Sequence, residues 1–271
     1  MTTRATAFSK VTLSLRVLGG RPDGYHELDA LVVPATEPHD SLTFAPTAEM
    51  SLRVSGPCAA GVPVDASNLA WRAAHAVGAT VSIGLVKGIP PGAGLGGGSA
   101  DAAAVLAALG GGCDAAMIAA ELGADVPVCL QGTPARMQGR GEIIEPIAGL
   151  PVLPLVIVAP EFGCDTAAVY RAWDALGEPR AHRELDAPRG YPGPFVNDLE
   201  PAAEHIEPRL QTFRENAEDI MGKPLLMCGS GSAFVAWFDD DAAANDAQQR
   251  AADAIGERVW RSDVIVGSRS S

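Results

Sequence analysis

The segment that decides the fold is PPGAGLGGGSADAA, residues 90–103. It holds five glycines between positions 92 and 98, and an alanine-rich run from Ala100 to Leu109 follows at once. Glycines leave backbone N–H groups exposed, and a loop that leads into a helix N-terminus binds phosphate through these donors and the helix dipole. A plain surface turn needs fewer glycines, so the run favours a phosphate loop. Its candidate contacts are Pro91, Gly92, Ala93, Gly94, Leu95, Gly96, Gly97, Gly98 and Ser99.

Two common nucleotide motifs describe this loop poorly. No Gly-Lys-Ser/Thr ends it, which excludes a Walker A loop. Gly92, Gly94 and Gly97 fit the dinucleotide pattern G-x-G-x-x-G, but such a match is weak in a glycine-rich stretch. The acid at the distance expected for ribose binding, Asp114, lies at a predicted helix start and not at a strand end. A dinucleotide-dependent oxidoreductase is therefore a distant third interpretation.

Composition and charge describe an ordinary globular protein with an acidic surface. The 271 residues suffice for one large domain or two modest ones, and 47% hydrophobic residues exclude general disorder. Lys and Arg number 20 against 33 Asp and Glu, which gives a net charge of −13. This balance argues against nucleic acid or an anionic membrane as a partner. A phosphorylated small molecule remains compatible, because a small local cluster of positive charge can hold it.

The cysteines and the apolar runs predict a cytoplasmic protein. The cysteines form no C-x-x-C pair and lack histidines at ligand spacing, so we expect buried thiols in a reducing compartment and neither a disulfide framework nor a zinc site. The N-terminus has no apolar segment typical of a signal peptide. The longest apolar run, 152–159, contains Pro154 and is too short to span a bilayer. The five cysteines are Cys58, Cys113, Cys129, Cys164 and Cys228.

Hydrophobic periodicity predicts an α+β fold. Strands and helices mix without a regular βαβ alternation, which disfavours a doubly wound sheet. A Gly- and Pro-rich link at 149–154 marks a plausible domain boundary. The predicted helices cover 68–77, 100–109, 114–122, 166–176, 199–213 and 242–255, with a further helix start at Asp125. The predicted strands cover 11–17, 42–44, 52–54, 81–87, 155–159, 225–228, 234–238 and 258–266.

Four segments together carry a family resemblance. PGAGLGGGSADAA at 91–103 resembles the phosphate loop of the GHMP kinase superfamily, and CGSGSA at 228–233 resembles that superfamily's C-terminal glycine motif. KVTL at 10–13 with RPDGYHEL at 21–28, and LGADVP at 122–127 with GRGE at 139–142, narrow the likeness to the 4-diphosphocytidyl-2-C-methyl-D-erythritol kinases. PDGYHEL is the specific signature, since the glycine loop alone indicates only the superfamily. The motifs follow the family's order over almost the whole chain.

The resemblance implies a fold and a reaction. Residues 1–150 would form an N-terminal domain like the second domain of ribosomal protein S5, and residues 151–271 a ferredoxin-like C-terminal domain. The two glycine motifs would meet at a cleft between them. ATP with Mg²⁺ would phosphorylate the 2-hydroxyl of diphosphocytidyl-methylerythritol, a step of the non-mevalonate isoprenoid route. The partners would be these two small molecules, and the sequence leaves the oligomeric state open between a monomer and a weak dimer.

The resemblance also changes how two charged residues are interpreted. From sequence alone, Asp125 before Val-Pro is typical of a helix N-cap, and Lys10 of a solvated charge at a strand start. The resemblance makes Asp125 the general base and Lys10 the cation that keeps it ionised and offsets the phosphoryl charge. Ser99 is predicted to be a helix N-cap and a phosphate or Mg²⁺ contact, and it is the one candidate for a metal contact.

Substrate contacts follow from the resemblance by position. Tyr25 and Tyr170 would stack on the cytosine, and His26 would hydrogen-bond its polar edge. The remaining matched positions are Thr12 and Thr166 for the substrate, Asn68 and Lys87 beside the adenine, and Gly229, Ser230 and Gly231 in the C-terminal glycine motif.

The chain departs from the family at two positions. Thr12 replaces the usual Asn, so a hydroxyl must supply that hydrogen bond, and Ala100 replaces a second Ser of the loop. Asp101 is retained and is predicted to lie in the first helical turn, where it would favour the dipole.

Two other functions compete with this one. Another GHMP kinase that acts on a mevalonate-type or sugar substrate would keep the ATP chemistry and lose the cytosine recognition. A non-catalytic nucleotide-binding protein of the same fold would bind without transfer, although the acid at Asp125 counts against it. For the loop itself, we predict that Gly94→Val or Gly97→Val weakens ATP binding more than folding.

Overall fold

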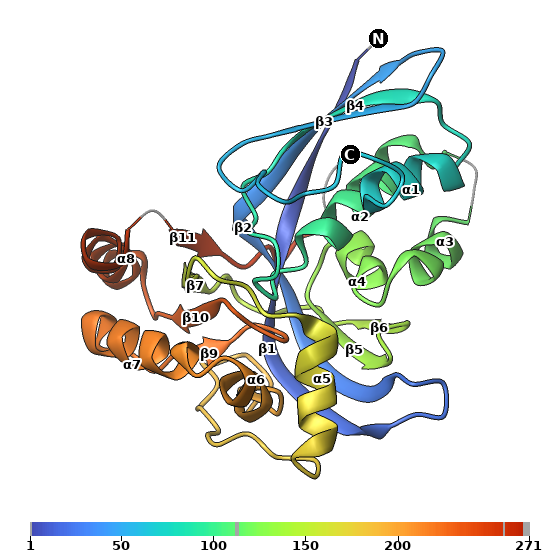
Figure 1. Ribbon diagram of the computed structural model, residues 1–271. Coiled ribbons are helices and arrows are strands. Elements are labelled where there is room, and N and C mark those ends of the chain that lie inside the picture. The colour runs from blue at the N-terminus through green and yellow to red at the C-terminus, as the bar shows by residue number, and fades with distance from the viewer. Residues whose placement is uncertain (1, 112–113, 257, 268–271) are drawn as a thin grey trace.

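The computed structural model describes residues 2–111, 114–256 and 258–267, and it is built around two β-sheets (Figure 1). The larger, seven-stranded sheet has the order β3-β4-β2-β1-β8, with β5 paired to β2 and β6 paired to β5. The smaller, four-stranded sheet has the order β11-β7-β10-β9. The larger sheet's strands are β1 (Thr3–Gly20), β2 (His26–Pro46), β3 (Ser51–Ser55), β4 (Val81–Val86), β5 (Ala135–Gly139), β6 (Ile143–Pro146) and β8 (Val196–Asn197), and the smaller sheet's are β7 (Pro154–Val158), β9 (Leu226–Met227), β10 (Phe234–Trp237) and β11 (Val259–Asp263).

The helices form two groups. Those of the first half lie together beside the larger sheet, and those of the second half lie with the smaller sheet (Figure 1). The predicted α+β class is confirmed, and none of the described helices is long and apolar enough to cross a bilayer. The helices are α1 (Leu69–Ala76), α2 (Gly97–Leu109), α3 (Ala115–Leu122), α4 (Val126–Gln131), α5 (Thr166–Ala175), α6 (Glu200–Ile206), α7 (Arg209–Met221) and α8 (Asp241–Ile255).

The long hairpin of β1 and β2 is the main departure from the predicted strands. The sequence predicts a short strand at 42–44, but β2 begins at His26 and pairs with β1 along nearly its whole length. Pro34 and Pro38 hide this strand from a pattern search because proline removes a ladder donor. The ladder accommodates Pro38 in a bulge, since Phe8 pairs with His39 while Ser9 pairs with Ala35.

Three further predictions about elements need correction. The helix predicted over 199–213 is two helices, because Pro208 cannot continue the hydrogen bonding of α6 and instead starts α7, which runs on to Met221. The alanine helix begins at Gly97 and not at Ala100. Strands β5, β6 and β8 were not predicted, since each is short and lies beside Gly or Pro.

The two halves of the chain are joined by strand pairing. β8 pairs in parallel with β1, so a segment from the second half adds to the larger sheet. Beyond β11, Ile265 donates its backbone N–H to the carbonyl of Pro34 at 2.9 Å. The division at residue 150 stays a prediction, and so does the state of Cys113, which lies outside the described residues.

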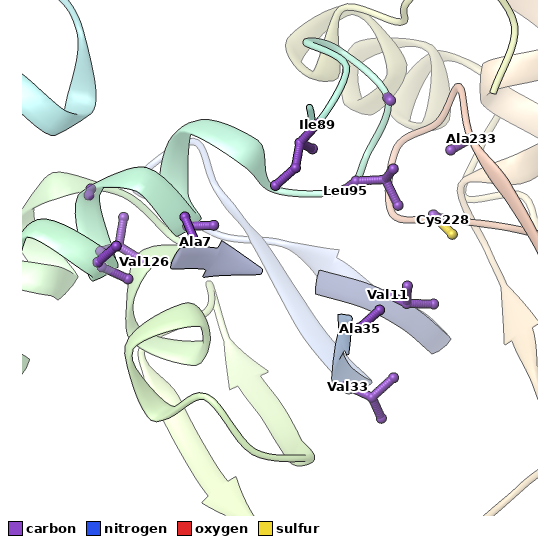
Figure 2. Close-up of a cluster of buried hydrophobic side chains, with 14 of the residues drawn as sticks. Ala7, Val11, Val33, Ala35, Ile89, Leu95, Val126, Cys228 and Ala233 are labelled. Atoms are coloured by element: carbon purple, nitrogen blue, oxygen red, sulfur yellow. The ribbon is translucent and has the colours of Figure 1, made fainter. Parts of the chain in front are cut away.

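A continuous hydrophobic core places the glycine loop between the two sheets. Figure 2 shows Ile89 and Leu95, at the two ends of the loop, above the β1 side chain of Val11, with Cys228 and Ala233 on the facing segment. All five side chains are fully buried. Burial of this kind contributes about 25 cal/mol per Å² of apolar surface, so both ends of the loop are anchored before any ligand binds.

Candidate active site

A cleft of about 870 Å³ opens where the glycine loop, the β1–β2 hairpin and α5 converge. Of the residues predicted for the site, only Gly231 does not line it. The cleft therefore joins segments that lie up to two hundred residues apart in the sequence. The predicted residues on its wall are Lys10, Thr12, Tyr25, His26, Asn68, Lys87, Pro91, Gly92, Ala93, Gly94, Leu95, Gly96, Gly97, Gly98, Ser99, Asp125, Thr166, Tyr170, Gly229 and Ser230.

The glycine loop turns its carbonyl groups toward the protein. Gly92, Gly94 and Gly96 adopt φ of +68°, +74° and +69°, the left-handed region in which glycine is favoured. The carbonyl of Gly92 accepts from the backbone N–H of Cys164 at 3.0 Å. The carbonyl of Leu95 accepts from the backbone N–H of Lys10 at 3.0 Å. The first N–H groups of α2 have no partner within the helix, as at every helix start. The loop thus has the geometry that suits an anion at the N-terminus of α2.

Ser99 and Asp101 lie three residues further into the helix than predicted, because the N-cap is Gly96 and not Ser99. Ser99 is therefore the third residue of α2. Ser99 still lines the cleft. Asp101 lies beyond the first turn and is buried, so it does not serve the helix dipole as predicted.

The two glycine motifs meet directly. A Cβ on Gly94 would lie 1.9 Å from the carbonyl oxygen of Cys228, and the N–H of Ala233 donates to the carbonyl of Ala93 at 3.0 Å. Any side chain at Gly94 would force the motifs apart, so the predicted Gly94→Val variant tests this junction and not phosphate binding. Gly98 has room, because its Cβ would lie 3.5 Å from Leu69, and Gly98→Ala is the sharper probe of the loop.

Lys10 and Asp125 form an ion pair at the base of the cleft. The Lys10 ammonium lies 3.3 Å from the Asp125 carboxylate and 3.4 Å from the Thr12 hydroxyl. The Lys10 side chain is 8% exposed, and that of Asp125 is 32% exposed. Asp125 occupies the N-cap position of α4 as predicted, but its side chain makes no capping hydrogen bond. The carboxylate is therefore available to a ligand in the cleft.

Lys87 lies in a second, buried cluster of charges. Its ammonium contacts the carboxylates of Asp40 and Asp101, the latter at 2.8 Å, and none of these three side chains is more than 3% exposed. Asp40 also accepts the N–H groups of Gly88 at 2.7 Å and Ile89 at 2.9 Å, where the chain enters the glycine loop. Asn68 caps α1 by accepting from Ala70 at 2.9 Å. Both residues predicted beside the adenine thus also have structural contacts.

Burial changes the protonation of this cluster. It raises the pKa of Asp101 to about 8, although the Lys87 ammonium acts in the opposite direction. The Asp101 Oδ1 is buried and has no hydrogen-bond partner among the described residues. Asp40 uses both oxygens, so Asp101 is the carboxyl that takes up a proton.

An aromatic wall forms the other side of the cleft. The Tyr25 ring is half exposed, with the Arg140 guanidinium 5.1 Å from its centroid. His26 stacks on Tyr170 with centroids 4.7 Å apart and meets the edge of Trp173 at 5.5 Å. Burial raises the pKa of the Tyr170 hydroxyl, and the charge of Asp125 raises it further. This wall offers flat apolar surface with polar groups at its margin, which suits a heteroaromatic ring.

Hydrogen bonds join the start of α5 to the C-terminal glycine motif. The hydroxyls of Thr166 and Ser230 lie 2.9 Å apart, and Ser232 donates to the Phe162 carbonyl at 2.6 Å. The aromatic wall and the glycine loop are therefore held by one connected set of segments.

Comparison with known proteins identifies the family. A family model described as the GHMP kinases N terminal domain matches residues 68–133. A 4-diphosphocytidyl-2-C-methyl-D-erythritol kinase of Jannaschia sp. (strain CCS1) is 40% identical over 259 residues, covering 91% of this chain and 92% of that protein. The protein of the same name from Dinoroseobacter shibae is 41% identical over 266 residues, covering 92% and 89%. The chain belongs to the 4-diphosphocytidyl-2-C-methyl-D-erythritol kinase family. It is a small-molecule kinase, and its membership of the GHMP kinases implies the use of ATP.

Two solved structures share this fold over nearly the whole chain. A crystal structure of 4-(cytidine 5'-diphospho)-2C-methyl-D-erythritol kinase matches with a TM-score of 0.75 at 35% identity, covering 98% of this chain and all of that one. A mevalonate kinase from L. major, solved with R-mevalonate, matches with a TM-score of 0.70 at 14% identity, covering 99% of this chain and 98% of that one. The second likeness shows the fold alone. The GHMP kinase fold with two domains, predicted from the motifs, is confirmed.

Several residues of this kinase's cleft were not predicted. Arg140 was in a quoted motif without a role, and Arg171 and Asp174 follow Tyr170 on the same helix. The spacing of four residues between Tyr170 and Asp174 places both on one helix face, which was the available signal. Asp40, which lies behind the cleft on Lys87, had no signal, because the strand segment that carries it was not predicted.

Proposed function

We propose that this kinase transfers the γ-phosphoryl group of ATP to the 2-hydroxyl of 4-diphosphocytidyl-2-C-methyl-D-erythritol, a step of the non-mevalonate isoprenoid precursor pathway. The observation that carries this proposal is the position of the Lys10–Asp125 pair. It lies in one cleft with a phosphate-binding glycine loop and an aromatic wall. Both the shared name of the relatives and this geometry support the same reaction.

In this proposal, different residues of the cleft accept the proton, stabilise the charge and hold the phosphates. Asp125 accepts the proton of the attacking hydroxyl, because its carboxylate is about one-third exposed and makes no capping hydrogen bond. Lys10 pairs with that carboxylate and offsets the charge of the transferred group. The first turn of α2 and the glycine loop hold the phosphates of ATP. Phosphoryl transfer depends mainly on such positioning and charge stabilisation.

The aromatic wall binds the cytidyl group in this proposal. Tyr25 presents a half-exposed ring face, and Tyr170 and His26 form a stacked pair beside it. Thr12 and Thr166 supply hydroxyls for the rest of the substrate, and Gly229 and Ser230 complete the wall. Asn68 and Lys87 lie on the side of the adenine.

Mg²⁺ fits this site as an ion carried by ATP. The described residues contain no group of three or more acidic, His or Cys side chains that could hold a metal ion by themselves. Mg²⁺ commonly keeps several waters and binds through substrate phosphates with few protein ligands, which suits a cleft that offers the Ser99 hydroxyl beside the glycine loop. When bound, it would neutralise charge on the phosphates. A cytoplasmic location and the oligomeric state stay predictions.

One assay tests the reaction and its competitors. ADP release is measured with the full-length protein, ATP and Mg²⁺, with the cytidyl substrate in one series and mevalonate in another. We expect turnover with the cytidyl substrate alone. Turnover with mevalonate would instead support another GHMP kinase activity, and ATP binding without turnover on either would support a non-catalytic protein. Phosphorus NMR of the product identifies the hydroxyl that was phosphorylated.

A further inference from the structure

The His26 ring is held on three sides by residues of α5. Its Nε2 lies 2.8 Å from the Asp174 Oδ1, one face stacks on Tyr170 and its edge meets Trp173. The His26 side chain is 9% exposed, whereas that of Asp174 is 54% exposed. The stack and the edge contact fix the plane of the ring. The hydrogen bond then fixes its rotation, so each ring nitrogen has a defined direction.

This contact decides which nitrogen carries the proton. An ionised carboxylate can only accept hydrogen bonds, so Nε2 must donate to Asp174. In a neutral imidazole the other nitrogen, Nδ1, is then an acceptor. Nδ1 has no hydrogen-bond partner among the described residues. It is absent from the buried polar atoms that lack a partner, so it is accessible from outside the protein. Since His26 lines the cleft, Nδ1 offers a lone pair to a ligand there.

A lone pair at this position distinguishes two pyrimidines. Cytosine carries an exocyclic amino group that donates, whereas uracil carries a carbonyl oxygen at the same ring position. The amino group can donate to Nδ1, but the carbonyl would place a second lone pair against it. A buried polar group left without its partner weakens binding of the wrong ligand.

We propose that Asp174 is a positioning residue that sets the protonated nitrogen of His26 and thereby makes the cleft select cytosine over uracil. The proposal rests on the proposed function, because that function places a cytidyl group against His26. Asp174 need not touch the substrate. Its effect passes through the imidazole, as the orienting partner of a histidine does at other sites.

The variant Asp174→Asn tests this selection. An asparagine amide can donate to Nε2, which releases the ring to carry its proton on Nδ1. Asp174→Glu keeps an acceptor of the same charge, and Asp219→Asn removes the charge of an exposed acid on α7 that has no ion pair or side-chain hydrogen bond among the described residues. All variants are made in the full chain.

Binding of CDP and UDP is measured by calorimetry at about pH 8, with a non-hydrolysable ATP analogue present at saturation. We expect the wild-type protein to prefer CDP by at least about tenfold and Asp174→Asn to lose that preference. Asp174→Glu should retain most of it, and Asp219→Asn all of it. ¹⁵N NMR of the His26 ring, assigned with His26→Gln, should show protonated Nε2 in the wild type and a shift toward protonated Nδ1 in Asp174→Asn.

An unchanged CDP-to-UDP ratio in Asp174→Asn would overturn the proposal, and so would a wild-type protein that binds both equally. These outcomes are separable from failure of the proposed function. A protein that selects CDP through Asp174 but does not phosphorylate the cytidyl substrate keeps this inference and loses the reaction. A protein that phosphorylates the substrate with an unchanged ratio in Asp174→Asn keeps the reaction and loses this inference.

Discussion

Two lysines line the same cleft, but they differ in the number and burial of the carboxylates with which they pair. Lys10 pairs with Asp125, a single carboxylate that is about one-third exposed. Lys87 is enclosed with Asp40 and Asp101, two carboxylates that are almost fully buried. Removing one partner from a buried cluster leaves an uncompensated charge, whereas a pair that opens to solvent contributes little to stability. The proposed function assigns the chemistry to the Lys10–Asp125 pair, whereas the contacts of the Lys87 cluster hold the start of the glycine loop.

The largest expected effect is on catalysis at the Lys10–Asp125 pair. Asp125→Asn should lower kcat by about 10²–10⁴-fold, because an amide cannot accept the hydroxyl proton as a carboxylate does. Melting temperature and the KM values should change little, since the Asp125 side chain makes no capping hydrogen bond. Steady-state kinetics and calorimetry measure both.

The matched control is Asp240→Ala, which removes an N-cap that accepts from Ala243 at 2.8 Å outside the cleft. It should lose about 0.5–2 kcal/mol of stability with normal kcat. Near-normal turnover in folded Asp125→Asn would remove Asp125 from the mechanism.

The buried cluster should show the reverse pattern. Lys87→Met leaves Asp40 and Asp101 facing each other without their cation, and we expect a loss of about 3–5 kcal/mol in the free energy of unfolding. Lys10→Met should lose about 1 kcal/mol or less while it lowers kcat strongly. Urea unfolding and kinetics of the two variants test the comparison directly. Equal stability losses in both would show that the two lysines do not differ as described.

Two adjacent glycines lie close to the two lysines, so that a side chain added at each glycine would meet a different lysine. A Cβ on Gly96 would lie 2.6 Å from the Lys10 Cγ, and one on Gly97 would lie 3.1 Å from the Lys87 Nζ. Gly96→Ala should therefore lower kcat by about 10- to 10²-fold through displacement of Lys10. Gly97→Ala should lower stability and ATP affinity more than kcat.

Gly222→Ala supplies the control, because Gly222 has φ of +66° and open space around its Cβ. It reports the cost of the left-handed backbone alone, about 1–2 kcal/mol. If Gly96→Ala loses no more activity than Gly222→Ala, contact with Lys10 does not decide the rate.

The smallest effect is a pH dependence that comes from the buried cluster. Burial raises the pKa of Asp101 from an ordinary 3.8 to about 8, so the folded protein holds a proton that the unfolded chain releases. The contribution is fully present below about pH 4 and is lost as the pH rises to about 8. Asp101→Asn should flatten the fall in unfolding free energy between about pH 5.5 and about pH 8.5.

Glu200 also lowers the unfolding free energy as the pH rises, because burial raises its pKa to about 7. Part of the slope therefore remains in Asp101→Asn, and the exposed-acid variant Asp219→Asn should keep the full slope. An identical slope in Asp101→Asn and in the wild type would assign the proton to another group.

Local sequence was enough to predict the glycine loop that lines the cleft. The glycine run and the alanine helix behind it are contiguous, so their spacing alone predicts a loop that leads into a helix N-terminus. The same holds for α1, α5 and α8, whose periodic patterns are close to the observed bounds. Element bounds failed where a proline interrupted the pattern, as in β2 and at Pro208.

The site beyond the loop was predicted by resemblance and not by pattern. From position alone Asp125 is typical of a cap, and the structure agrees with the position while its carboxylate turns to Lys10 instead. Asp174 was missed although its spacing of four residues from Tyr170 placed it on the same helix face, because the spacing does not show that this face meets the hairpin at His26.

The sequence by itself therefore determined the local features, namely the glycine loop, the excess of acidic residues and most helices. The loop and the helices each depend on neighbours within a few residues. Only the tertiary structure decided which charges are paired and how deeply. Lys10 and Asp125 are 115 residues apart, and Asp40 reaches Lys87 across 47. Burial sets the strength of a charge interaction and the protonation of a carboxyl. Burial is a property of the packed chain, so it could not be read from residues taken in order.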